Sequence, residues 1–188
     1  MTEHNKAIPA QSAVHAYESL TPVVVLDALA SVGLAGDGRL MALSSYENRV
    51  YQVHLESPVG SDDLASDIVV VKFYRPDRWS DAQIIEEHEF ATELMAAEIP
   101  VVGALALNGT TLHHFNGFSF SVSPSRGGRR PELDNFDVLE WIGRFLARIH
   151  TVGSARPFTQ RPALNLQTFG NDCRDILLKG GYLPLDME

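Results

Sequence analysis

The amino-acid sequence predicts an α+β protein: one helix, then about five strands with a second helix inserted after the third strand, then further helices. Three strand-like runs precede the strongest helical pattern, and two hairpin signals, Asn108-Gly109 and Asn116-Gly117, follow it at once. Strands and helices therefore do not alternate as they do in a parallel βαβ sheet. A packed core is expected, because 45% of the 188 residues are apolar and 21% are charged.

The chain is expected to begin with a tail and a helix. Residues 1–20 are polar and mixed in character, which predicts a loose tail. Thr21 and Pro22 are typical of an N-cap followed by proline at the first helical position. This first helix is expected to end near Gly33.

Three strands are expected next. Residues 40–55 indicate two strands joined by the polar turn 44–48, and apolar and polar residues alternate well in the second of them. Residues 68–74 form an apolar run that only Lys72 interrupts. The Arg-Pro pair that follows is expected to end this third strand.

The strongest helical pattern covers residues 80–98. Ser80 and Gln83 have the spacing of a capping box, and Pro100 is expected to close the helix. Short strands are expected around the two hairpin turns, at residues 101–107, 111–115 and 118–122.

The last third of the chain is expected to be helical. Residues 123–131 are rich in Ser, Pro, Gly and Arg and are the best linker candidate. Residues 138–149 carry an apolar stripe with helical spacing, and this helix is expected to end near Gly153. The final 35 residues carry weak signals.

Charge and cysteine content exclude several classes of protein. The net charge of −9 argues against general binding to nucleic acid or to an anionic membrane, because phosphate binding needs a high density of Lys and Arg. No apolar run has the length of a signal peptide or a membrane span. The single cysteine, Cys173, cannot form an internal disulfide, which predicts a reducing, cytoplasmic location.

Lys72 is the first candidate functional residue. Its stem must lie against a largely apolar strand, so its ammonium either reaches water at a sheet edge or meets an anionic partner. Helical spacing places Glu87 of the next helix in one apolar stripe with Ile84 and Leu94. The other nearby glutamates fall on the opposite, polar side: Glu86, Glu89 and Glu93. We therefore expect Lys72 and Glu87 to lie within about 4 Å of each other.

Two further features have an ordinary and a functional interpretation. The turn 44–48 is either a polar hairpin or a cradle of backbone N–H groups and hydroxyls for phosphate oxygens. It has neither the glycines of a Walker A loop nor those of a dinucleotide fingerprint. His88 lies on the apolar side of its helix, which is more typical of a hydrogen-bonded core histidine than of a catalyst.

Several motifs resemble the bacterial stress response kinase A family, Ser/Thr protein kinases with an aminoglycoside-phosphotransferase-like fold. The two long ones are SYENRVYQ at 45–52 and VKFYRPDRW at 71–79, and the short ones are EEH at 86–88 and NGF at 116–118. The resemblance implies a protein-kinase-like N-lobe, with a five-stranded antiparallel sheet and one inserted helix, over residues 21–123. Residues 124–188 would then be the hinge and the first helices of a helical C-lobe.

The resemblance also implies an ATP site. Lys72 would hold the α- and β-phosphates and Glu87 would orient it. The other implied ATP contacts are Ser45 and Asn48 in the phosphate turn, Val50 and Val70 as adenine walls, and hinge backbone at Val122, Ser123 and Ser125.

The sequence departs from the family at its catalytic centre. The catalytic loop of the form His-Gly-Asp-x-His-x-x-Asn and the later Asp-x-Asp that binds Mg²⁺ are both absent. We therefore expect an N-terminal, ATP-binding portion of a kinase that uses ATP and Mg²⁺ on a protein Ser or Thr, inactive alone, without its general base or metal ligands. Two alternatives stay open: part of a small-molecule kinase, or a non-catalytic nucleotide-binding or interaction fragment.

The apolar stripe of the helix at 138–149 normally packs against C-lobe elements in this family. It is therefore expected to be partly uncovered in this chain, or paired with another chain. Its main members are Val138, Ile142, Phe145 and Ile149.

Overall fold

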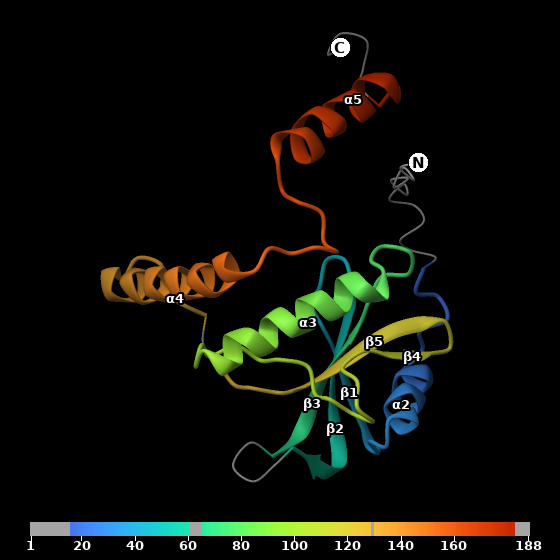
Figure 1. The fold of residues 1–188 in the computed structure, drawn as a ribbon. Coiled ribbons are helices and arrows are strands. Elements are labelled where there is room, and N and C mark those ends of the chain that lie inside the picture. Colours follow the sequence, from blue (N-terminus) through green and yellow to red (C-terminus); the bar gives the residue numbers. More distant parts are fainter. Residues whose placement is uncertain (1–15, 61–64, 129, 183–188) are drawn as a thin grey trace. The chain divides into compact units, whose positions relative to one another are not determined.

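The computed structural model describes residues 16–60, 65–128 and 130–182, and Figure 1 shows the fold. The architecture is α+β, as the sequence predicts, with a five-stranded antiparallel sheet in the order β1-β2-β3-β5-β4. The strands are β1 (Gly36–Leu43), β2 (Arg49–Val59), β3 (Ser66–Phe73), β4 (His113–Phe115) and β5 (Phe118–Pro124). The chain forms two compact units, Met1–Ala155 and Arg156–Glu188.

The register of the sheet decides which side chains share a face. Val50 of β2 pairs with Lys72 of β3, and Lys72 pairs with Ser121 of β5. In the same way Val70 pairs with Ser123. Because side chains alternate along a strand, these residues lie on one face and the odd-numbered residues of β3 lie on the other.

The main hydrophobic core covers the second of these faces. Helix α2 (Pro22–Ser31) lies beside the sheet and buries Val25, Ala28 and Leu29 completely (Figure 1). Each such burial stabilises the fold by about 1.5–3 kcal/mol for a side chain of Val or Leu size. The partners of α2 in this cluster come mainly from β3 and β5: Val69, Val71, Phe73, Phe118, Phe120 and Val122.

Part of the segment predicted as a tail belongs to this core. Tyr17 and Leu20 are 8% and 7% exposed, and the Tyr17 ring stacks on Phe118 with 6.2 Å between centroids. Residues 1–15 lie outside the described ranges. Helix α2 begins as predicted, with Thr21 as N-cap and proline at its first position.

Helix α3 (Asp81–Ala96) is attached to the opposite face of the sheet. Its N-terminus has the predicted capping box between Ser80 and Gln83. The apolar cluster on this side is small and comprises Tyr74, Ile84 and Leu112, with Trp79 packed against them. Polar contacts therefore contribute a larger share of the attachment of α3 than of α2.

The predicted position of Glu86 is wrong. Glu86 is only 5% exposed, although it lies opposite Ile84 on the helix, whereas Glu89 is exposed as predicted. Phe90, one turn after Glu86 on the same side, lies so close to Gly153 that a Cβ atom there would be 3.4 Å from the ring. A second element thus covers α3 on this side, and a single apolar stripe does not describe its environment.

The predicted strand at residues 101–107 is also wrong. This segment is extended, and Leu105 N donates to Val122 O at 2.7 Å, but only an isolated bridge joins Leu107 to Thr110. That bridge closes the turn at Asn108 and Gly109, both of which have positive φ. The turn was predicted correctly, but its first arm pairs too little to form a strand. The second arm contributes the three-residue strand β4.

Helix α4 (Phe136–Ala155) begins two residues before the predicted stripe at 138–149 and ends close to Gly153, as predicted. Arg148 Nη2 donates to Ala97 O and Glu98 O, at 2.9 and 3.0 Å, and so ties α4 to the end of α3. In the second unit, a π-helical turn (Gln167–Asn171) leads into α5 (Asp172–Lys179). No helix within the described ranges is both long and apolar enough to cross a membrane.

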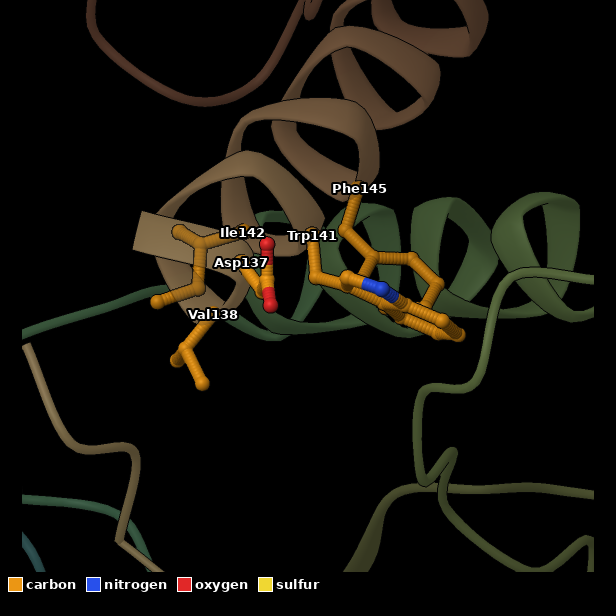
Figure 2. A pocket seen from close by; sticks show the side chains of 5 residues that line it. All are labelled: Asp137, Val138, Trp141, Ile142 and Phe145. Carbon is orange, nitrogen blue, oxygen red and sulfur yellow. The ribbon is translucent and has the colours of Figure 1, made fainter. Parts of the chain in front are cut away.

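The apolar stripe of α4 is partly uncovered, as predicted: Val138, Ile142, Phe145 and Ile149 are half-buried. None of the residues that the structure describes in α4 is buried, and Trp141 is 60% exposed. Figure 2 shows the side chains of Val138, Trp141, Ile142 and Phe145 on one side of the helix, where they line a shallow groove.

Candidate functional site

Lys72 and Glu87 form the contact that the sequence predicts. Lys72 Nζ donates to Glu87 Oε1 at 3.0 Å, so strand β3 and helix α3 are joined by an ion pair. The two side chains are 31% and 40% exposed. At this exposure an ion pair stabilises a fold by about 0–1 kcal/mol, so its main effect here is to fix the position of the ammonium group.

A second group holds the same ammonium. Lys72 Nζ lies 4.6 Å from the centroid of the Tyr74 ring, in the geometry of a cation–π contact. This role of Tyr74 was not predicted from the sequence, although residues i and i+2 of a strand lie on the same face. Lys72 therefore has a carboxylate and an aromatic ring as neighbours, and its exposed part is available to a ligand.

The turn between β1 and β2 is held by a hydrogen bond within it and by another to the segment after β3. Ser45 Oγ donates to Asn48 O at 2.7 Å, within the turn. Asn48 Oδ1 accepts from the backbone N–H of Arg75 at 3.2 Å, so the Asn48 side chain links the turn to the segment after β3. The side chain of Asn48, an implied ATP contact, thus already takes part in holding this turn.

Glu47 makes further contacts that were not predicted from the sequence. Its Oε1 accepts from Trp79 Nε1 at 2.9 Å and lies 3.4 Å from Arg78 Nε. The backbone carbonyl of Glu47 accepts from the Tyr17 hydroxyl at 3.0 Å. Glu47, Arg78 and Trp79 all lie in the two long motifs, which is the one signal that singled them out. A turn without glycine is thus kept in place by side chains.

The proposed adenine walls lie on the Lys72 face. Val50 and Val70 are half-buried, and their register places them next to Lys72 and Ser123 respectively. The Val122 side chain instead points into the core beside α2 and is fully buried. The Val122 side chain is therefore not available to a ligand.

The expected hinge continues strand β5. Ser125 N donates to Ile68 O at 2.9 Å, and Val122 O accepts from Leu105 N at 2.7 Å. Two backbone groups implied for adenine contacts are thus already hydrogen-bonded within the protein. Beyond β5, a cavity of about 650 Å³ is lined by Met95, residues 100–105, Pro124, Arg126, Gly127 and Gly60.

Other titratable groups offer no metal centre in the part of the chain that the structure describes. No three side chains of His, Cys, Asp or Glu come together there as metal ligands. Burial, and then the charge of His114, lowers the pKa of His113, whose Nε2 is buried without a hydrogen-bond partner among those residues. His114 Nε2 contacts Asp81 Oδ2 at 2.9 Å.

Comparison with known proteins agrees with this geometry. Residues 40–175 match the phosphotransferase enzyme family. The chain is 43% identical, over 168 residues, to stress response kinase A of Salmonella typhi and to serine/threonine protein kinase RdoA of Salmonella typhimurium. It is 42% identical, over 172 residues, to stress response kinase A of Escherichia coli (strain K12).

The alignments cover most of this chain but only about half of each relative. The Salmonella alignments include 89% of this chain but 49% of the relatives, and the Escherichia coli alignment includes 92% and 50%. The chain thus spans about half the length of the curated relatives it matches. The resemblance inferred from the motifs is confirmed.

Proposed function

Because this chain belongs to the phosphotransferase enzyme family, we propose that it is the ATP-binding part of a kinase that phosphorylates Ser or Thr hydroxyls of a protein. The observation that carries the proposal is the Lys72–Glu87 pair, with 3.0 Å between Nζ and Oε1, on a sheet face that keeps Val50 and Val70 partly open. The name of the relative RdoA, a serine/threonine protein kinase, supports a protein acceptor.

The residues of this face fit a nucleoside triphosphate. Lys72 supplies a positive charge for the α- and β-phosphates, and Glu87 keeps that charge at one position. The β1–β2 turn carries Ser45, an exposed hydroxyl residue, and directly precedes strand β2, which carries Val50. Val50 and Val70 offer apolar surface for the adenine ring, next to the backbone of Ser123 and Ser125.

Mg²⁺, when bound beside ATP, neutralises charge on the β- and γ-phosphates. The described residues contain no cluster of metal ligands, so we assign no residue of this chain to the ion. We propose residues 21–123 as the nucleotide-binding lobe and residues 124–188 as the hinge and the start of a second lobe. The single cysteine, Cys173, is exposed and free, which supports a cytoplasmic location.

The proposal is tested by nucleotide binding to the 188-residue chain. We expect a fluorescent ATP analogue to bind, and Lys72→Met to weaken binding by roughly tenfold or more, since a charge-assisted contact contributes about 1.5–3 kcal/mol. Glu87→Gln removes the charge that orients Lys72 and should weaken binding by a smaller factor. Glu89→Gln, an exposed glutamate on the same helix, is the matched control.

Equal affinity of the wild type and Lys72→Met would contradict the assigned site. The acceptor is tested separately with the corresponding longer protein, offered a protein substrate or a small amino alcohol. Phosphorylation of the amino alcohol alone would favour a small-molecule kinase.

A further inference from the structure

A buried polar network lies directly behind the Lys72–Glu87 pair. The Tyr74 hydroxyl is 2.7 Å from His88 Nε2 and 3.2 Å from Ser121 Oγ. His88 Nδ1 is 2.8 Å from Thr111 Oγ1. One chain of hydrogen bonds thus connects strand β5, the end of β3, helix α3 and the segment before β4.

The members of this network are shielded from water. Tyr74, His88 and Ser121 are 3%, 7% and 4% exposed. Burial raises the pKa of the Tyr74 hydroxyl, which therefore stays protonated and can donate to one of its two partners. In a buried site, loss of one such bond leaves its partner unsatisfied, so these bonds restrict the structure more than exposed ones do.

The network is linked to the Lys72–Glu87 pair in two ways. The ring of Tyr74 faces Lys72 Nζ at 4.6 Å, and His88 directly follows Glu87 on α3. A rotation or shift of α3 that broke the Tyr74–His88 bond would move Glu87 with it. Because the apolar cluster under α3 has only three buried residues, this polar contact is a major determinant of the helix position.

We propose that Tyr74 and His88 are positioning residues for Lys72: their hydrogen bond locks α3 in the rotation at which Glu87 reaches the lysine. The ring of Tyr74 supports the ammonium from the other side. The expected effect on nucleotide binding rests on the proposed function. The expected effect on the position of Lys72 does not depend on it.

The structural readout is the NMR signal of the Lys72 side chain in the 188-residue chain. A methylene group next to an aromatic ring is shifted by the ring current, so the ¹³Cε–¹Hε signal of Lys72 reports its distance from Tyr74. Lys72→Met assigns the signal. Tyr74→Phe keeps the ring but removes the hydroxyl, and His88→Leu removes both ring nitrogens.

We expect both variants to move the Lys72 signal towards that of an exposed lysine and to weaken binding of the ATP analogue by about three- to tenfold, the equilibrium factor of one lost hydrogen bond. His88→Gln, whose amide can still bond to Tyr74, should restore most of the wild-type signal. Thr111→Val removes only the hydrogen bond between Thr111 and His88 Nδ1 and should shift the Lys72 signal less, in the same direction. Tyr182→Phe, at a residue that is 68% exposed, is the control for loss of a tyrosine hydroxyl.

The outcomes separate positioning from simple stabilisation. If Tyr74→Phe and Thr111→Val lower the free energy of unfolding but leave the Lys72 signal unchanged, the network only stabilises the fold and the proposal is wrong. The same holds if His88→Gln and His88→Leu behave alike. If the wild type binds no nucleotide, the proposed function fails, and the Lys72 signal still decides the role of Tyr74 and His88.

Discussion

Trp79→Phe removes the indole N–H that binds Glu47 and so tests how the β1–β2 turn is held. Trp79 Nε1 lies 2.9 Å from Glu47 Oε1. The Glu47 side chain, which also pairs with Arg78, is 29% exposed. A hydrogen bond to a charged acceptor contributes about 1.5–3 kcal/mol. Partial exposure lets water replace the donor, so we expect a contribution below this range, about 1–1.5 kcal/mol of unfolding free energy.

A double-mutant cycle isolates this contact from the loss of ring volume. Trp79→Phe, Glu47→Ala and the double variant are unfolded in urea, and the coupling energy between the two sites is calculated. The exposed pair Glu140 and Arg144, with side chains 60% and 71% exposed, is the matched control. It should give a coupling of about 0.3–0.5 kcal/mol.

The refuting result is a Glu47–Trp79 coupling no larger than that of the control pair. It would mean that the contact does not hold the turn in solution. A coupling near 1 kcal/mol, by contrast, is the size expected for contacting residues.

Two more predictions concern stability. Burial is the largest cause that raises the pKa of Tyr17 to about 12. Above pH 10 the unfolded chain therefore binds fewer protons than the folded one, so the free energy of unfolding should fall between pH 10 and 12. Urea titrations should show a smaller fall for Tyr17→Phe. An equal fall in both proteins would exclude Tyr17 as its source. Leu29→Ala, at a fully buried site, should lower the free energy of unfolding by about 2–5 kcal/mol. Leu139→Ala, at a 42% exposed site, should change it by about 0.5 kcal/mol or less in the same assay. Comparable losses would mean that the α4 face is covered in solution.

The features that were predicted correctly depend on short segments of the chain. The capping box of α3, the proline at the start of α2 and the Asn-Gly turns all follow from neighbouring residues. Lys72 in an apolar strand and Glu87 in an apolar stripe each follow from the period of one element. Their contact needed only the expectation that a buried charge finds an opposite one.

The errors arose where two elements meet. Glu86 was placed on a polar side because helical spacing describes one face of α3, and it does not show that Phe90, on the Glu86 side, lies close to Gly153 of α4. The extended residues 101–107 had the composition of a strand but pair with β5 only through Leu105. In both cases the neighbour that decides the outcome is distant in the sequence.

The sequence by itself determined the class of the fold, the order of its elements and the pairing of Lys72 with Glu87, because these follow from periodicity, capping and charge within short segments. Only the tertiary structure decided that Tyr74 and His88 bond behind that pair, and that Trp79 binds Glu47. Tyr74 and His88 are 14 residues apart and Glu47 and Trp79 are 32 apart. Hydrogen bonds over such separations depend on how strands and helices pack, and no local pattern contains that information.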